Sequence, residues 1–458
     1  MNRPEGRDRF DGHNRYERHD AGVLAAARAV IDACADASEM GEKVKEAVAR
    51  NAAWRGEECI NLLAPEAPTS PSVRALLAAE IGTRAAEGHI GAVNRWFAGT
   101  RHIDEVEALC VELLKRHFRC NYADHRMCAS MIGNAVVYTA LSRPGEVIMS
   151  AAQPVGGHSS NRLDGPAGAM GRKIVDIPFD PRELVVDIDL FRKAAPLVQP
   201  RLVALGLSMT LFPQPVADMK SVIGEWGGKL FFDAAHQLGL IGGRQFQDPL
   251  AEGADIMTGS AGKTFSGPQS GIILWDDPEI TEAVTEAVFP VWAATHQVNR
   301  VAALALATAE ALAFGDRLQA QIVANARALA KALQERGVPM LGAHKGFTTT
   351  HQAIADMRSF GRGLVAAKTL ERANIIVNKN LLPEDRKEDW DYPGGARIGT
   401  IEVTRFGMKE AEMEKIADFI ARILVRGEEP ERLRPEVVAL RRSFPTLYYC
   451  FEHGLPPG

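Results

Sequence analysis

Five short apolar runs constrain the fold of this chain more than any other feature. They read EVIMSA, RLVALGLS, KLFFDAA, ADIMTGS and SGIILW, and helical segments separate most of them. Short β-rich runs that alternate with helical segments are typical of a mostly parallel sheet covered by helices on both faces. The middle of the chain is therefore predicted to be a large α/β domain.

The segments on either side of this region predict two further parts. An alanine-rich helical pattern runs from about Asn299 to Gln334, with Gly315 interrupting it. Beyond it, HQAIADM, ANIIVNKN and ARIGTIEVT have strand patterns, and KEAEMEKIADFIARILVR is amphipathic. We expect an N-terminal arm with helices over residues 1–75, the large domain over 76–315, and a small α+β domain over 316–458.

Composition and charge exclude several classes of protein. A net charge of -5, with 24% charged residues, gives no footprint for nucleic acid or an anionic membrane. No apolar run approaches the roughly 18 residues of a membrane helix, and the charged N-terminal arm has no secretory core. The six cysteines form no CxxC or zinc pattern. We expect a cytoplasmic protein with reduced thiols and without a metal.

A glycine-rich segment around one lysine carries the clearest chemical signal. In MTGSAGKTFSGPQSG, GKT resembles the end of a P-loop, but Met257 stands where that motif needs its first glycine. A nucleoside-triphosphate site is therefore excluded. Lys263 is instead interpreted as the covalent anchor of a carbonyl cofactor.

A carboxylate and a hydroxyl accompany this lysine. KLFFDAAHQLG places Asp233 at the carboxyl end of a strand, where open α/β sheets bind ligands, and Ser260 precedes Lys263 by three residues. Pyridoxal phosphate needs a lysine for its imine, an acid for its pyridine nitrogen and donors for its phosphate. His236 could lie against the ring. Singly, these residues read as a helix cap, a surface lysine and a structural histidine; together they predict a pyridoxal-phosphate site.

A longer series of motifs resembles the serine hydroxymethyltransferase family of fold-type I pyridoxal-phosphate enzymes. The motifs are NLLAPEAPTSPSVRAL, AAEGHIGAVNRWFAG, VGGHSSN, FFDAAHQLGLIGG, GSAGKTFSGPQSGIIL, ANIIVNKNLLPED and ARIGTIEVTRFGMKEAEM. They occur in the family's order from about Asn61 to Tyr448. The resemblance implies an α/β fold with a seven-stranded sheet, pyridoxal phosphate as the cofactor, and a homodimer that shares its active sites.

The resemblance implies a role for each matching residue at the cofactor. Lys263 would form the imine, Asp233 would pair with the pyridine nitrogen, and His158 would stack on the ring. His236 and Ser208 would surround the ring oxygen. The phosphate donors would be Ser130, Ser260 and, across a dimer interface, the backbone near Ala294 and Thr295.

It also implies the contacts of the substrate. Arg397 would bind the α-carboxylate with both arms of its planar guanidinium. Glu87 would handle the proton of the β-hydroxyl group, and Phe97 would contact the substrate.

Four positions depart from the family pattern. Ala85 replaces a tyrosine, Trp96 and Phe97 replace a pair of tyrosines, and Gly262 replaces the histidine before the lysine. Losing these polar groups would leave their former partners unpaired. A family member adapted to another acceptor explains the pattern better than the plain serine enzyme does.

The segment KGFTTTHQ resembles the threonine transaldolase branch and is expected near the acceptor channel. Members of that branch cleave threonine and add its glycine unit to a second aldehyde. Folate-dependent serine or α-methylserine hydroxymethyltransferase stays an alternative, because VNKN, Phe289 and Glu87 match positions that line the folate pocket. Use of tetrahydrofolate is left open. An aminotransferase, a decarboxylase or an inactive protein on the same fold are further alternatives.

Overall fold

The computed structural model describes residues 19–457, and the chain divides into two compact units, residues 1–59 and 60–458. The first unit contains helices α1 (Ala21–Asp32) and α2 (Ala37–Asn51), followed by one π-helical turn (Ala52–Glu58). Asp20 and Asp36 cap the two helices, since the carboxylate of Asp20 accepts from two backbone N–H groups of the first turn and that of Asp36 accepts from one. The charged arm expected at the N-terminus lies largely in residues 1–18, outside the described residues.

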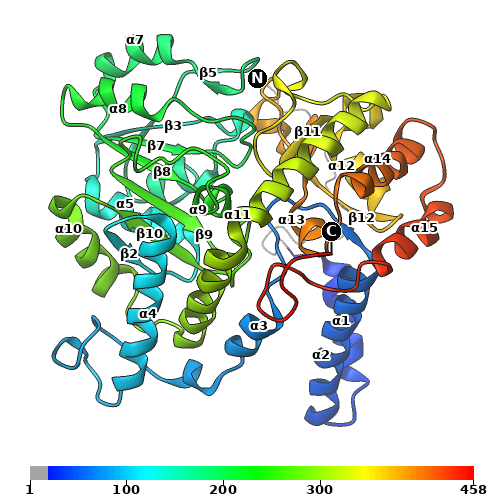
Figure 1. Cartoon of the computed structure of the whole chain (residues 1–458), viewed down its shortest axis with the longest axis horizontal. Helices are drawn as coiled ribbons and strands as arrows, with labels where there is room; N and C mark the ends of the chain where they lie inside the picture. The colour runs from blue at the N-terminus through cyan, green and yellow to red at the C-terminus, as the bar shows by residue number, and fades with distance from the viewer. Residues whose placement is uncertain (1–18, 458) are drawn as a thin grey trace. The chain divides into compact units, whose positions relative to one another are not determined.

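The second unit is built on a seven-stranded sheet (Figure 1). Its strands, in spatial order, are β2 (Tyr122–Asp124), β10 (Gly271–Trp275), β9 (Ile256–Ser260), β8 (Lys229–Asp233), β7 (Leu202–Gly206), β3 (Val147–Ser150) and β4 (Lys173–Asp176). Strands β9, β8, β7, β3 and β4 are parallel, and β10 is antiparallel to both of its neighbours. All five predicted runs form strands, which confirms the mostly parallel sheet.

Alternate side chains of this sheet enter two separate cores. Along β7, Val203 and Leu205 belong to one cluster of buried residues, and Leu202 and Ala204 belong to another. A strand that is apolar at every position therefore has both faces covered, as the sequence indicated. The helices of this region are α4 (Arg101–Phe118), α5 (Ser130–Leu141), α6 (Pro166–Ala169), α7 (Ile188–Val198), α8 (Val216–Gly224), α9 (Leu238–Gly242) and α10 (Thr281–Glu286).

One long helix connects this region to the rest of the unit. Helix α11 runs from Val298 to Glu335, with Leu304 in the core beside the sheet and Leu333 in the core of the C-terminal region. The interruption expected at Gly315 does not occur, because packing along the helix outweighs the modest helix penalty of one glycine. Gly315 is buried 3.6 Å from the ring of His117, counted from where a Cβ would stand.

Helix α11 also differs from the sequence-based expectation about membrane spans. Among the described residues it is the one helix long and apolar enough to cross a membrane. The sequence had been expected to contain no apolar segment of that length. Half of that apolar stretch is buried inside the protein, so its composition is that of a core helix.

The C-terminal region contains a three-stranded antiparallel sheet in the order β11 (Gln352–Asp356), β14 (Gly395–Gly399) and β13 (Asn378–Asn380). Its helices are α12 (Arg362–Glu371), α13 (Ile401–Arg405), α14 (Glu410–Leu424) and α15 (Pro430–Arg442). Strand β12 (Ile375–Ile376) pairs in parallel with β1 (Ile60–Asn61), and a small hairpin joins β5 (Phe179–Asp180) to β6 (Val185–Val186). Helix α3 (Pro71–Leu77) begins at the predicted Ser70-Pro71 signal, with the Ser70 hydroxyl accepting from Val73 N–H at 3.2 Å.

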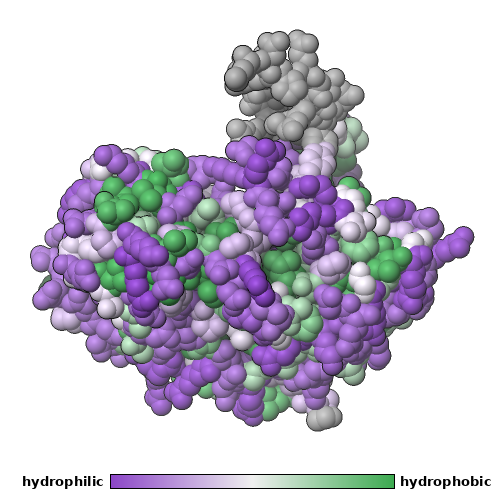
Figure 2. Space-filling model, turned by 90° about the horizontal axis from the view of Figure 1, so that it is seen from above, coloured by the Kyte–Doolittle hydropathy of each residue, from purple (hydrophilic) through white to green (hydrophobic). Residues whose placement is uncertain are grey.

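The surface and the thiols agree with the composition. The face shown in Figure 2 is mostly hydrophilic, with hydrophobic areas between the polar ones. All six cysteines lie within the described residues, and all six are free.

Candidate active site

A pocket of about 250 Å³ opens where three neighbouring parallel strands end. Gly206, Asp233 and Ser260 are the last residues of β7, β8 and β9, and all three line it. The other lining residues are Ala129, Ser130, Met131, His158, Leu207, Ser208, Ala235, His236, Lys263 and Gln269. The structure thus brings together seven of the predicted cofactor residues: Lys263, Asp233, His158, His236, Ser208, Ser130 and Ser260.

Asp233 is fixed by two amide groups that the sequence analysis did not identify as site residues. Its Oδ2 accepts from Asn134 at 2.8 Å and from Asn161 at 3.1 Å. The amides are themselves oriented, because Thr258 donates to Asn134 Oδ1 at 2.7 Å and Tyr138 donates to Asn161 Oδ1 at 2.5 Å. The other carboxylate oxygen of Asp233, Oδ1, accepts from the backbone N–H of Ala235 at 3.1 Å. Asn161 ends the motif VGGHSSN, but Asn134 lies inside a helix with no signal that marks it.

Lys263 lies in the turn after β9, beside Asp233 and Arg397. Burial lowers the pKa of Lys263 to about 8, Asp233 acts in the opposite direction, and the charge of Arg397 lowers it further. A larger fraction of this amine is therefore neutral near pH 7 than of an ordinary lysine, as a nucleophilic lysine requires. Helix α11 contacts this turn, because Gln319 Nε2 donates to Thr264 O at 2.7 Å.

Two glycines leave room for side chains that line the pocket. A Cβ on Gly206 would stand 2.7 Å from the Cβ of Asp233. A Cβ on Gly262 would stand 2.6 Å from the side-chain carbon of Gln269. Gln269 therefore occupies the space that a side chain at position 262 would need.

The two histidines of the pocket are neutral. Burial lowers the pKa of His158, whose Nδ1 lies 2.7 Å from the Ser160 hydroxyl. Burial and the charges of Lys263 and Arg397 hold the pKa of His236 well below its ordinary value. A neutral, flat imidazole is suited to stacking on an aromatic ring, the role predicted for His158.

Arg397 is a buried cation without an acidic partner. Its Nη1 donates to Ser208 O at 2.6 Å and its Nε to Asn378 Oδ1 at 3.2 Å, while Nη1 lies 3.3 Å from His236 Nε2. The side chain is 8% exposed, and burial lowers its pKa to about 10, so it stays charged at neutral pH. Among residues 19–457 no carboxylate forms an ion pair with it. A buried charge needs a partner, and this one is available to a ligand carboxylate.

The phosphate end of a cofactor has donors at the start of α5. Ser130 is the first residue of that helix, and no side chain caps its first turn. Free N–H groups at a helix N-terminus bind anions, and Ser260 offers a hydroxyl nearby in the same lining. The hydroxyl of Ser208 donates to Gly156 O at 3.0 Å, so it faces the pocket as an acceptor.

Five predicted residues are absent from the lining of this pocket: Arg397, which contacts the lining residues Ser208 and His236, and four that lie elsewhere in the single chain. Thr295 donates to the carboxylate of Glu87 at 2.5 Å, so these two are paired with each other. Phe97 is 45% exposed and Ala294 is exposed. Their predicted roles stay predictions about an assembly with a second copy.

A buried charged cluster holds the two segments that carry these residues. Glu107, on α4, accepts from His296 Nε2 at 2.7 Å and lies 2.9 Å from Arg95 Nη2 and 3.4 Å from His125 Nε2. Arg95 follows Glu87 in sequence, and His296 directly follows Thr295. The cluster had not been predicted, because its members are far apart in the sequence.

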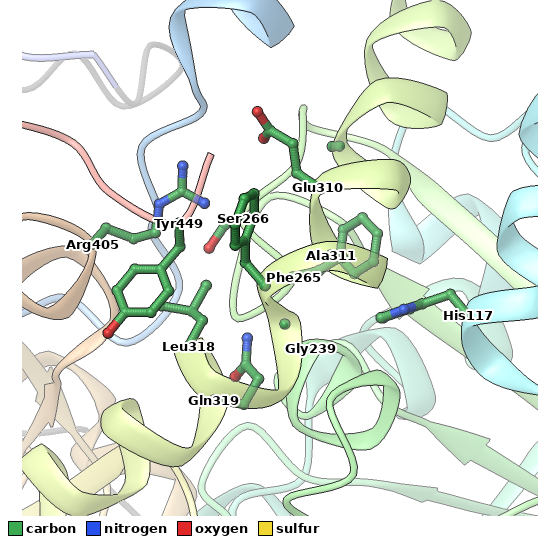
Figure 3. Close-up of a pocket in the computed structure, with 13 residues that line it drawn as sticks. His117, Gly239, Phe265, Ser266, Glu310, Ala311, Leu318, Gln319, Arg405 and Tyr449 are labelled. Carbon is green, nitrogen blue, oxygen red and sulfur yellow. The ribbon is translucent and has the colours of Figure 1, made fainter. Parts of the chain in front are cut away.

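A second, separate cavity lies behind the Lys263 turn (Figure 3). Ser266 lines it, and the Ser266 N–H donates to Lys263 O at 2.8 Å. Figure 3 places Arg405 and Tyr449 on one side of it and His117 on the other, with α11 between. None of the predicted site residues lines this cavity.

Comparison with known proteins identifies the family. The family model "Serine hydroxymethyltransferase" matches residues 38–420. The chain belongs to this family. It is 42% identical to the serine hydroxymethyltransferase of Korarchaeum cryptofilum over 92% of this chain and 99% of that protein. It is also 42% identical to the enzyme of Methanocaldococcus jannaschii, over 91% and 97% of the two chains.

A solved structure points to a second activity in the same fold. The L-threonine transaldolase of Pseudomonas fluorescens, in its internal aldimine state, superposes with a TM-score of 0.83 at 26% identity, covering 94% of this chain and 96% of that one. The family and this fold-type I neighbour confirm the predicted fold class and pyridoxal phosphate as the cofactor. The residues present fit that cofactor: an oriented carboxylate, a lysine of lowered pKa, a neutral histidine and phosphate donors surround one pocket.

Proposed function

We propose that this protein cleaves and forms the Cα–Cβ bond of β-hydroxy-α-amino acids and transfers a glycine unit to an acceptor aldehyde, as a threonine transaldolase does. The observation that carries the proposal is the buried guanidinium of Arg397, which has no carboxylate partner and lies beside Lys263 and His236. An amino acid whose α-carboxylate pairs with Arg397 would have its amino group close to Lys263. Such a site selects α-amino acids by charge.

Each residue has a separate task in this proposal. Pyridoxal phosphate supplies an electron sink when bound, and Asp233 would keep its pyridine nitrogen protonated. Lys263 would hold the cofactor through its side-chain amine. Arg397 orients the substrate, and Glu87 of the partner subunit would take the proton of the β-hydroxyl group and return one after addition.

The transaldolase version is supported by three of the positions that depart from the family pattern. Gln269 fills the space beside Gly262, where the family pattern has a histidine, and Ala85 and Phe97 carry no hydroxyl. These residues make the surroundings less polar than those expected of a serine–folate enzyme. The similarity to an L-threonine transaldolase at 26% identity agrees with this choice.

Folate-dependent serine or α-methylserine hydroxymethyltransferase is the second candidate. It is favoured by relatives with that enzyme's name at 42% identity. It is also favoured by Phe289, which packs edge-on against His89 with ring centroids 5.7 Å apart, close in sequence to Glu87. Tetrahydrofolate would then be the carrier of the one-carbon unit.

We further propose a homodimer with shared sites. Glu87 and Thr295 bond to one another outside the pocket of their own chain, so a second copy would present them to it. In the N-terminal unit no residue of α1 or α2 is buried, and Val23, Val44 and Val48 are 68%, 66% and 65% exposed. Such apolar side chains suit an interface. Six free thiols suit a reducing compartment such as the cytoplasm.

The decisive experiment compares two reactions of the purified enzyme. Threonine with a test aldehyde, in the absence of folate, should yield a new β-hydroxy amino acid and release the aldehyde of threonine. Serine with tetrahydrofolate should turn over more slowly. Efficient folate-dependent serine cleavage with no exchange from threonine would assign the second candidate instead.

A further inference from the structure

Gln352 lies directly behind the substrate side of the pocket. It is the first residue of β11 and is fully buried. Its Oε1 accepts from Thr210 N–H at 3.0 Å, and its Nε2 donates to Ser208 O at 3.0 Å. These two bonds fix which end of the amide is which, because a backbone N–H only donates and a carbonyl oxygen only accepts. One Nε2 hydrogen remains, and it faces two histidines.

Those histidines form a stacked pair beneath Arg397. The rings of His236 and His351 lie 5.6 Å apart with planes 15° from parallel. Gln352 Nε2 is 3.2 Å from His236 Nδ1 and 3.3 Å from His351 Nε2. His236 Nδ1 is 3.4 Å from His351 Nε2. Burial lowers the pKa of His351 to about 3, so both rings are neutral and each carries one proton.

The position of each proton follows from Arg397. A guanidinium only donates, and Arg397 Nη1 lies 3.3 Å from His236 Nε2, so that nitrogen must be the bare acceptor. The proton of His236 is then on Nδ1, where it points at His351 Nε2. His351 Nε2 is therefore also bare, and it accepts from Gln352. The reverse arrangement would set a proton of His236 against a proton of Arg397, whereas this one leaves Gln352 Nε2, 3.2 Å from His236 Nδ1, to donate to His351 alone.

We propose that Gln352 is a positioning residue that holds Arg397 in the orientation that receives the substrate carboxylate. Three groups restrain the guanidinium: Ser208 O, Asn378 Oδ1 and His236 Nε2. Gln352 bonds the first directly. Gln352 acts on His236 through His351. Gln352 Nε2 and His236 Nδ1–H both donate to the bare Nε2 of His351, which keeps the proton of His236 on Nδ1 and leaves Nε2 free to accept from Arg397. The proposal rests on the proposed function in one respect, that Arg397 binds a carboxylate.

Two variants separate this role from simple support of the fold. In Gln352→Leu both amide bonds and the donor to His351 are lost. In Gln352→Glu the acceptor for Thr210 N–H remains, but a negative charge replaces the donor and raises the pKa values of the histidines beside it. The matched control is Gln214→Leu, which removes another buried amide, bonded to Val186 N–H at 3.0 Å and Phe212 O at 3.0 Å, outside the pocket.

The first measurement is a nitrogen NMR spectrum of protein labelled with ¹⁵N-histidine, with His236→Asn and His351→Asn used to assign the signals. We expect a bare Nε2 and a protonated Nδ1 on both rings in the wild type and in Gln214→Leu. In Gln352→Glu one ring should take up a second proton as the pH is lowered. A wild-type His236 with its proton on Nε2, or a Gln352→Glu spectrum identical to the wild type at every pH, would overturn the proposal.

The second measurement is the affinity of the holoenzyme for glycine, followed by the cofactor spectrum. Loss of the restraint should weaken binding by roughly threefold to tenfold in Gln352→Leu, the effect of one hydrogen bond. In Gln352→Glu the loss should deepen as the pH falls, because a charged imidazole then faces Arg397. Unchanged affinity in both variants would also overturn the proposal. If the wild type itself binds no glycine, the proposed function fails, while the NMR result still decides the proton arrangement.

Discussion

Asn134, in the second turn of α5, donates a hydrogen bond of 2.8 Å to Oδ2 of Asp233, the last residue of β8. The bond thus joins two parts of the pocket lining. One is α5, whose N-terminal residue Ser130 is a predicted phosphate donor, and the other is the carboxylate of Asp233. Because Thr258 donates to Asn134 Oδ1, the amide cannot turn over, and Asp233 keeps one orientation. The carboxylate is thus oriented within the chain itself, as the role proposed for it at the pyridine nitrogen requires.

Asn134→Leu should weaken the binding of pyridoxal phosphate. A hydrogen bond to a charged group contributes about 1.5–3 kcal/mol, so we expect a loss of roughly tenfold or more in affinity. Titration of the apoenzyme with the cofactor measures it. Thr258→Val, which only frees the amide to turn, should have a smaller effect. Equal affinity in Asn134→Leu and the wild type would show that Asp233 does not depend on this bond.

Arg397→Ala should abolish binding of the amino acid while the colour of the cofactor on Lys263 persists. Losing one partner of a desolvated charge pair costs about 2–5 kcal/mol, or roughly 30-fold to several-thousand-fold in affinity. Arg397→Lys keeps the charge but loses the planar fork, so it should bind with intermediate affinity. A spectral titration with glycine is the measurement. Normal binding by Arg397→Ala would remove that residue from substrate recognition.

The uptake of cofactor by the apoenzyme should depend on pH through Lys263. The neutral amine reacts and the charged form does not, so the rate should rise with pH and level off above a midpoint near 8. Asp233 raises the pKa of Lys263, and Asp233→Asn should therefore move the midpoint to lower pH. Borohydride reduction and peptide mapping should find the label on Lys263. A label on another lysine, or a midpoint near 10, would contradict this assignment.

Glu107→Gln should destabilise the protein at neutral pH. Burial alone would raise the pKa of Glu107, but hydrogen bonds with His125 and His296 outweigh it and hold the pKa below its ordinary value. A lowered carboxylate pKa contributes stability above the unfolded pKa and loses it as the pH falls toward the folded one. The cost, about 3–5 kcal/mol for a broken buried pair, should therefore shrink below about pH 4.5.

Unfolding in urea at a fixed protein concentration, repeated from pH 8 down to about pH 3, tests this expectation. The control is Glu112→Gln on the same helix, whose carboxylate is 69% exposed and paired with Lys115. It should cost no more than about 1 kcal/mol at any of these pH values. A pH-independent cost in Glu107→Gln would mean that packing, not charge, explains its effect.

Mixed dimers test whether Glu87 acts across the interface. Lys263→Ala and Glu87→Gln should each be inactive alone. If the partner subunit supplies Glu87, a mixed dimer has one site with both wild-type groups, and activity should return on mixing after dissociation and reassociation. No recovery would indicate that Glu87 acts on its own chain or not at all.

The sequence was sufficient for the sheet and for the residues that end its strands. Strand β8 is apolar at three consecutive positions and ends in Asp233, so its burial and its ligand both follow from local pattern. The contacts of Gln352 could not be found in this way, because Thr210 and His236 lie more than a hundred residues away. Gly315 was misjudged because helix propensity is local, whereas the packing of α11 that overrides it is not.

Helix α11 carries a geometric consequence for how members of this fold can change. At about 1.5 Å and 100° per residue, inserting one residue near its middle would advance and rotate everything beyond it. Strand β14, with Arg397, lies beyond that point, whereas the Lys263 turn lies before it. The position of Arg397 relative to the Lys263 turn therefore depends on the number of residues in α11. Substrate choice can diversify by exchanging side chains or by lengthening loops. A change in the length of α11, however, would move Arg397 relative to Lys263.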